Sequence, residues 1–114
     1  MCNSNNNADT NYLVLSGCTF DSNQSLAAAA VYWIGAELTL TSCTFSNNTS
    51  TGSAAAVKYY TRLASKLTVT SSTFTGNDAQ ITGSDIYIAA KNTDVTAAMT
   101  VVITSTNFTS SKST

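Results

Sequence analysis

The chain has 114 residues, with five Lys or Arg against six Asp or Glu, and its formal net charge is −1. This sparse and balanced charge argues against nucleic-acid binding, which needs clustered basic side chains to neutralise phosphates, and no apolar run reaches the roughly 18 residues of a membrane-spanning helix. Histidine is absent, so the usual general base near neutral pH and a common metal ligand are missing. We therefore expect no enzyme, cofactor or metal site.

The two ends of the chain differ from its middle. Residues 1–11 are polar and rich in Asn, so they offer little to bury and we expect a loose N-terminal tail. Residues 12–111 carry a repeated pattern, and residues 112–114 form a short C-terminal tail. At this length the repeats make up one domain or part of one.

An eight-residue pattern occurs four times, at 13–20, 38–45, 67–74 and 101–108. Apolar and polar residues alternate with the period of a β-strand, and the alternation slips by one at a small residue, where we expect the backbone to bend. The small residues are Gly17, Ser42, Ser71 and Ser105. Each copy closes with an aromatic residue: Phe20, Phe45, Phe74 and Phe108.

An asparagine follows the closing Phe by three positions in the first three copies, as Asn23, Asn48 and Asn77. Asn suits a turn because it tolerates positive φ and its side chain bonds to nearby backbone. Stacked asparagines can also pair their amides in a ladder. Asn23, Asn47, Asn48 and Asn107 begin glycosylation sequons, although chance matches are common in so polar a chain.

A second strand is predicted in each repeat, where small residues are followed by β-branched and aromatic ones, at 28–33, 54–59 and 83–88. Residues 53–67 alone also fit a helix, with an Ala run and basic residues at fourfold spacing. Repeats share one structure, and 83–88 has a strand pattern. We therefore choose the strand.

No single repeat can bury its own Phe and Leu, so the copies must stack. In-register parallel stacking places the four Phe residues in one column, and Leu13, Leu38, Leu67 and Val101 in another. The predicted fold is all-β: a right-handed parallel β-helix, or solenoid, of about four irregular rungs.

The Phe-x-x-Asn turns, followed by a small-small-(Ala/Asp)-(Val/Ile) strand, resemble the repeats of chlamydial polymorphic outer-membrane proteins. Residues 83–87 match that family's Gly-Gly-Ala-Ile signal best, whereas 29–31 and 55–57 use Ala in place of Gly. The resemblance spans about residues 13–111. It implies a β-helix in a surface-exposed, adhesin-like structural protein, with no enzymatic site to carry over.

Threonines in the first predicted strand of each repeat face outward and suggest a candidate binding face of Thr39, Thr41, Thr68, Thr70 and Thr104. A flat Thr-x-Thr lattice is similar to that of ice-binding solenoids. The alternative is that Thr is simply a good exposed strand residue. Val14 and Val102 interrupt the grid and favour this alternative.

Cys18 and Cys43 occupy equivalent positions and would be stacked neighbours, within the ~4.4–6.8 Å Cα range of a disulfide. Two buried free thiols that act as small apolar side chains are the other possibility, and the one we favour.

Five aromatic residues of the second strands would form a glycan-binding strip if enough of them face out: Tyr32, Trp33, Tyr59, Tyr60 and Tyr87. The acids are scattered over different repeats, which disfavours a catalytic cleft. They are Asp21, Glu37, Asp78, Asp85 and Asp94.

From these patterns we expect a structural or adhesive module, extracellular or at the cell surface, that either stacks end to end or belongs to a longer β-helix. Exposed strand edges at both ends would make another copy, or a neighbouring segment, its partner. A binding module for a glycan or for ice is the alternative function.

Overall fold

The computed structural model describes residues 12–26, 30–81, 85–90, 99–109 and 112–113. Within these ranges every regular element is a β-strand, and all the strand pairs are parallel. The prediction of an all-β chain with parallel strands is confirmed. The expected tail at residues 1–11 lies outside the described residues.

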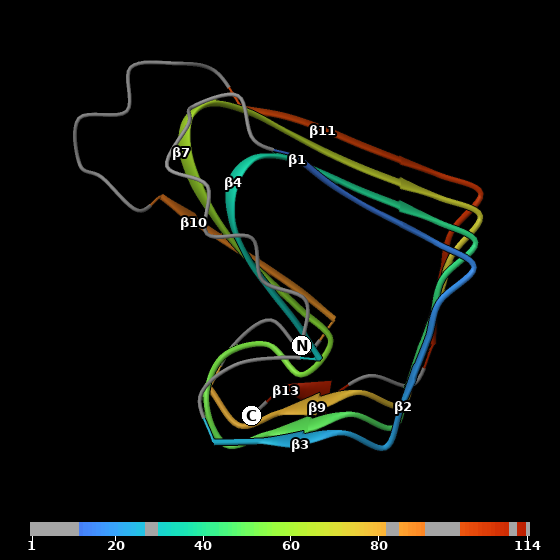
Figure 1. Cartoon of the computed structure of the whole chain (residues 1–114). Helices are drawn as coiled ribbons and strands as arrows, with labels where there is room; N and C mark the ends of the chain where they lie inside the picture. The colour runs from blue at the N-terminus through green and yellow to red at the C-terminus, as the bar shows by residue number, and fades with distance from the viewer. Residues whose placement is uncertain (1–11, 27–29, 82–84, 91–98, 110–111, 114) are drawn as a thin grey trace.

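The strands form three sheets, which we call A, B and C (Figure 1). Sheet A contains β1 (Tyr12–Ser16), β4 (Val31–Thr41), β7 (Val57–Thr70), β10 (Ile86–Ala90) and β11 (Met99–Thr104). Sheet B contains β2 (Thr19–Asp21), β5 (Thr44–Ser46), β8 (Thr73–Thr75) and β12 (Asn107–Thr109). Sheet C contains β3 (Gln24–Ser25), β6 (Thr49–Ser50), β9 (Asp78–Ala79) and β13 (Lys112–Ser113). The last strand lies in the segment that we expected to be a C-terminal tail.

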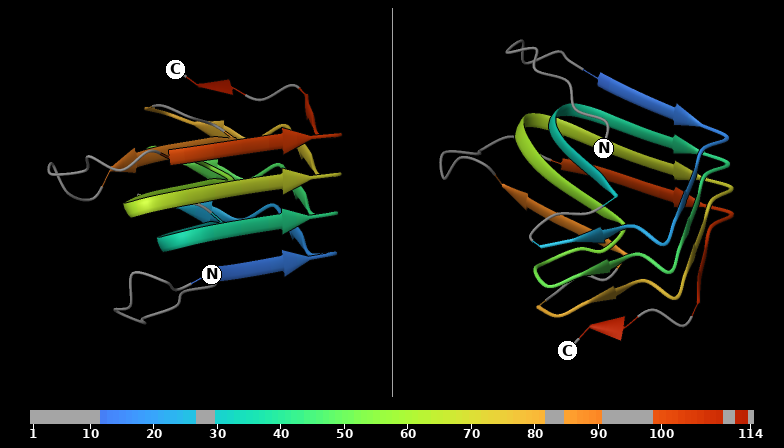
Figure 2. Two further views of the ribbon diagram at one scale, coloured as in Figure 1. Left: turned by 90° about the horizontal axis from the view of Figure 1, so that it is seen from above. Right: turned by 60° about the horizontal axis from the view of Figure 1, so that its bottom comes forward.

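The chain visits the sheets in the order A, B, C and then returns to A, and we call each such circuit a pass. Equivalent residues of successive passes pair in register, as in the column Leu13, Leu38, Leu67 and Val101 (Figure 2). The repeat spacing varies from pass to pass, yet the register of the apolar residues is kept, because a shift by one position would turn the whole apolar set outward.

Among the described residues, two corners of each of the first three passes and one corner of the fourth are made by single residues with positive φ. At the corner between sheets A and B these are Gly17, Ser42, Ser71 and Ser105, with φ between 48° and 64°. At the corner between sheets B and C they are Ser22, Asn47 and Gly76. We assigned Asn23, Asn48 and Asn77 to this turn, and the residue before each of them is the one that has positive φ.

The second strand of one repeat is continuous with the first strand of the next, so that β4 and β7 are long and strongly curved (Figure 1). Their pairing shifts register between Gly35 and Glu37. There the hydroxyl of Tyr59 donates to the carbonyls of Gly35 and Ala36, at 3.1 and 2.8 Å. Because β7 spans residues 57–70, the helical alternative for residues 53–67 does not hold.

The apolar core lies between the sheets and is built from the residues that alternate inward. The fully buried large side chains are Trp33, Tyr59, Phe45, Phe74, Leu38, Leu40, Leu67, Val31, Val57 and Val69. The first and last passes are less covered, because each has a neighbouring pass on one side only. In the described part of the chain, no helix is long and apolar enough to cross a membrane.

Candidate functional site

The four phenylalanines at the ends of the repeats form one column across sheet B. Successive ring centroids, from Phe20 through Phe45 and Phe74 to Phe108, are 4.9, 4.8 and 4.9 Å apart. The ring planes differ by 7°, 6° and 14°. The rings therefore follow the spacing of the parallel strands. This column is a structural feature, since Phe45 and Phe74 at its centre are fully buried in the core.

The three asparagines lie beside the phenylalanines and form a hydrogen-bonded column of their own. Oδ1 of Asn48 accepts from the backbone N–H and from Nδ2 of Asn23, and Oδ1 of Asn77 accepts in the same way from Asn48. Nδ2 of Asn48 also donates to the carbonyl of Phe20 at 3.0 Å. Asn48 is fully buried, so a glycan on its sequon would require the loss of these bonds.

The outward threonines of sheet A form two columns, as their register demands. Thr41, Thr70 and Thr104 pair in one column, in which the hydroxyl of Thr104 donates to that of Thr70 at 3.4 Å. Thr39 and Thr68 pair in the other column, which ends in the exposed residues Val14 and Val102. The hydroxyl lattice is thus bounded by apolar side chains, and ice binding by this face stays a prediction.

A second array of hydroxyls, which we did not anticipate, lies on the outer face of sheet B. Thr44 pairs with Thr73, and Ser46 pairs with Thr75. Next to them, the hydroxyl of Ser46 donates to Oδ1 of Asp21 at 2.6 Å. This bond and one from Ser22 lower the pKa of the Asp21 carboxyl below its usual value. The outward positions on either side of each Phe could have been identified by extending the period-two alternation past the corner.

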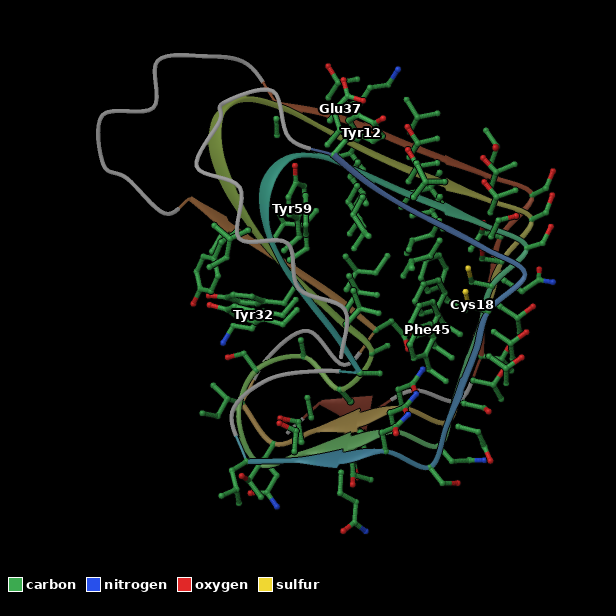
Figure 3. All side chains as sticks on the ribbon, in the orientation of Figure 1. Tyr12, Cys18, Tyr32, Glu37, Phe45 and Tyr59 are labelled. Atoms are coloured by element: carbon green, nitrogen blue, oxygen red, sulfur yellow. The ribbon has the colours of Figure 1, made fainter. Side chains whose placement is uncertain are left out.

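The aromatic residues of the second strands divide between the two faces of sheet A. Trp33 and Tyr59 pair in register and are fully buried. Figure 3 shows Tyr59 within the curve of β4 and β7 and Tyr32 on the opposite face. Two of the five candidate strip residues are therefore core side chains.

The other three tyrosines surround a lysine on the outer face, and we call Tyr32, Lys58, Tyr60 and Tyr87 the tyrosine–lysine patch. Nζ of Lys58 lies 6.0, 5.4 and 5.6 Å from the ring centroids of Tyr32, Tyr60 and Tyr87. The rings of Tyr32 and Tyr60 meet edge to face, with centroids 5.7 Å apart. All four side chains are half-buried. Burial, and then the proximity of Tyr60, raise the pKa of Tyr32, so its hydroxyl stays neutral at physiological pH.

The two cysteines of the predicted pair are free thiols in the structure. Sγ of Cys43 donates to the carbonyls of Leu15 and Thr41, both at 3.4 Å, and Sγ of Cys18 donates to that of Ser16 at 3.6 Å. Burial raises the pKa of the Cys43 thiol, which favours the protonated and unreactive form. Cys43 is buried and Cys18 is half-buried. The free thiols that we favoured and the alternative of a disulfide in solution both stay untested.

A groove of about 470 Å³ runs over sheet C. Its exposed or half-buried walls include Gln24, Thr49 and Asp78, which occupy one register column, and Leu26, Thr51 and Gln80 beyond them. Among the residues that the structure describes, no group of three acidic, Cys or His residues could hold a metal ion.

Comparison with models of known families, with curated proteins and with solved structures gave no match. The resemblance to the chlamydial repeats therefore stays an expectation. Of the features described above, the tyrosine–lysine patch combines aromatic rings with a charge on an accessible face. Lys58 was missed as part of this patch because its place between Tyr32 and Tyr87 depends on the register of three strands.

Proposed function

We propose that the chain is a structural, non-enzymatic module of an extracellular or cell-surface assembly, and that its fold is a right-handed parallel β-helix of about four rungs. Three parallel sheets visited in one order on every pass support this fold, as do the in-register columns. The low charge and the resemblance to the surface repeats of chlamydial proteins support the location.

One observation supports the proposed role most directly: at the last pass, side chains that continue the columns of the apolar core are exposed. Phe45 and Phe74 are 0% exposed and lie between two rings each, whereas Phe108 is 47% exposed. Val101 and Ile103, whose partners Leu67 and Val69 are fully buried, are 45% and 42% exposed. Another parallel pass, about 4.8 Å further on, would bury all three side chains.

The first pass offers a matching surface. Leu13 and Phe20, at the equivalent positions, are half-buried, and Tyr12 is 69% exposed. The strands β1 and β2 are at the edge of their sheets, as are β11 and β12 at the other end. Edge strands with free backbone groups and apolar side chains are suited to pair with another chain. Head-to-tail contacts between two different ends do not close, so repeated contacts build a filament.

The test is the mass and shape of the protein against concentration, by light scattering and electron microscopy of the same sample. We expect the mass to grow with concentration and elongated particles to appear. Phe108→Asp should reduce this growth, because it places a charge among apolar side chains. Thr109→Asp is the matched control, since Thr109 is exposed on the same strand and alternates to the outer face.

A monodisperse monomer at high concentration would contradict stacking between copies. The same holds if Phe108→Asp and Thr109→Asp associate to an equal degree. In that case a neighbouring segment of a longer β-helix becomes the partner to test, with a chain that carries further repeats.

A further inference from the structure

We propose that the tyrosine–lysine patch is a binding site for a carboxylated saccharide, that is, a sugar chain containing uronic acid. The rings of Tyr32, Tyr60 and Tyr87 would stack on apolar faces of the sugar rings, and Lys58 would bind the carboxylate. Tyr87 lies on β10, an edge strand of sheet A, whereas Tyr32, Lys58 and Tyr60 lie on the inner strands β4 and β7. The assembly contacts are tested instead at Phe108 on β12, so the two proposals can be tested separately.

The rings come from three different passes, and register brings them together. Lys58 pairs with Tyr32 on one side and with Tyr87 on the other, and Tyr60 follows two positions along β7, on the same face. Aromatic side chains with an apolar body and a polar hydroxyl suit ligands that present both apolar and polar groups. A group of aromatic side chains on one outer face is typical of a binding surface.

Two of the three strands under the patch are packed on the core, which favours binding. The inner faces of β4 and β7 hold Trp33 and Tyr59, both fully buried. The hydroxyl of Tyr59 ties the bend of β4 through the carbonyls of Gly35 and Ala36. A site on packed strands loses little conformational freedom when a ligand binds.

The charge of the patch decides which saccharide fits. The ammonium of Lys58 lies within 6.0 Å of all three ring centroids, where cation–π attraction holds it in place. An ammonium group carries three donors, and hydrogen bonds between charged groups are about twice as strong as neutral ones. One fixed cation matches a single carboxylate per sugar. A densely sulfated saccharide would need several cations at the site, and the tyrosine–lysine patch contains one lysine, Lys58.

The experiment measures binding of an oligogalacturonate of defined length by calorimetry and by NMR shift changes of the tyrosine rings. The methyl ester of the same oligomer is the matched ligand, because it keeps the sugar rings but loses the charge. We expect the acid to bind about tenfold or more tightly than the ester. Added salt should weaken the binding of the acid and leave the ester unaffected.

The variants separate ring stacking from charge. Lys58→Gln should reduce the affinity for the acid to that for the ester, and Lys58→Arg should retain most of it. Tyr60→Ala should lower the affinity for both the acid and the ester. Lys66 is an exposed lysine on the same strand, so Lys66→Gln is the control and should change neither affinity. Circular dichroism of each variant verifies that it folds.

Failure of the site is distinguishable from failure of the proposed assembly. Phe108→Asp should bind the saccharide normally, and Lys58→Gln should associate normally. Equal binding of acid and ester overturns the proposal, as does an equal effect of Lys58→Gln and Lys66→Gln. So does the absence of any binding at millimolar oligomer by folded wild-type protein, and Lys58 would then only stabilise the cluster of rings.

Discussion

Nδ2 of Asn77 donates a hydrogen bond to Oδ1 of Asp85 at 2.9 Å, so the column of asparagine amides ends on a carboxylate. In the two preceding passes, the same donor group meets the Oδ1 of the next asparagine. The fourth copy of the repeat has Ser111 where an asparagine would stand. Asp85, from the segment that precedes β10, supplies the missing acceptor. The column is thus closed by a carboxylate from the third copy of the second-strand pattern, and not by another asparagine.

Replacing Asp85 should destabilise the fold through this bond. Asp85→Ala leaves the buried amide of Asn77 short of one acceptor, and we expect the free energy of unfolding to fall by about 1–3 kcal/mol. Asp85→Asn keeps an Oδ1 acceptor, so its free energy of unfolding should fall by less. Urea unfolding measures both. Glu37→Ala, at an exposed position, is the control and should stay within about 0.5 kcal/mol of wild type. A loss for Asp85→Ala no larger than this would show that the closing bond is unimportant.

Gly76 and Gly17 form a matched pair of corners that differ in the space around them. Both have φ of +64°, but a Cβ at Gly76 would lie 2.8 Å from Oδ1 of Asn47, whereas one at Gly17 meets nothing within 4 Å. Gly17→Ala should cost about 1 kcal/mol from the backbone alone. Gly76→Ala should cost more, because the side chain of Asn47 must move as well. Thermal unfolding compares them.

An Asn47→Gly background tests that explanation of the Gly76 result. With the side chain of Asn47 removed, Gly76→Ala should cost as little as Gly17→Ala does. If the larger cost persists in this background, a different contact is responsible.

The column of phenylalanines should respond to truncation according to position. Phe74→Ala removes a fully buried ring that stacks on both sides, and we expect a loss of about 3–5 kcal/mol. Phe108→Ala should reduce the free energy of unfolding by clearly less, because the ring of Phe108 is half exposed and stacks on one side. Both variants should be unfolded at a protein concentration low enough to prevent association. Equal losses would mean that the exposed end is covered in solution.

The carboxyl of Asp21 should titrate below its usual range, because Ser46 and then Ser22 donate hydrogen bonds to its charged form. A depressed pKa in the folded state stabilises the fold above the pKa of the unfolded chain, and this contribution is lost as the pH falls through the folded pKa. NMR titration of the side-chain carboxyl carbon measures the value. Ser46→Ala should raise the pKa of Asp21 toward the usual value, and by more than Ser22→Ala does. An unchanged pKa in Ser46→Ala would rule out that bond as the main cause.

The repeat is recognisable in the amino-acid sequence because its signals are local. Alternation along 13–20 and its copies predicts strands, and a small residue such as Gly17 or Ser42 marks where the backbone bends. Since no copy can bury its own Phe, stacking follows, and with it the columns of like residues. These inferences need no knowledge of distances between remote residues.

Other features depend on contacts between passes, which a linear pattern does not contain. Whether Tyr59 is core and Tyr60 is surface depends on the phase of a long curved strand and on its register shift at Gly35. The two strands of each repeat were predicted as separate elements, and their continuity in β4 and β7 was missed, because the segment that joins them differs in length between the repeats. Positive φ lies at Asn47 and not at Asn48, whose amide bonds to Asn23 and Asn77 in the column.

By itself, the sequence determined that the chain is all-β, where the first bend of each repeat lies and which side chains stack, because apolar periodicity and the need to bury it act along the chain. Only the tertiary structure decided that Asp85 closes the asparagine column and that three tyrosines gather around Lys58. Both depend on residues from different passes meeting at a few ångströms, and the register that brings them together is set by the packing of the whole interior.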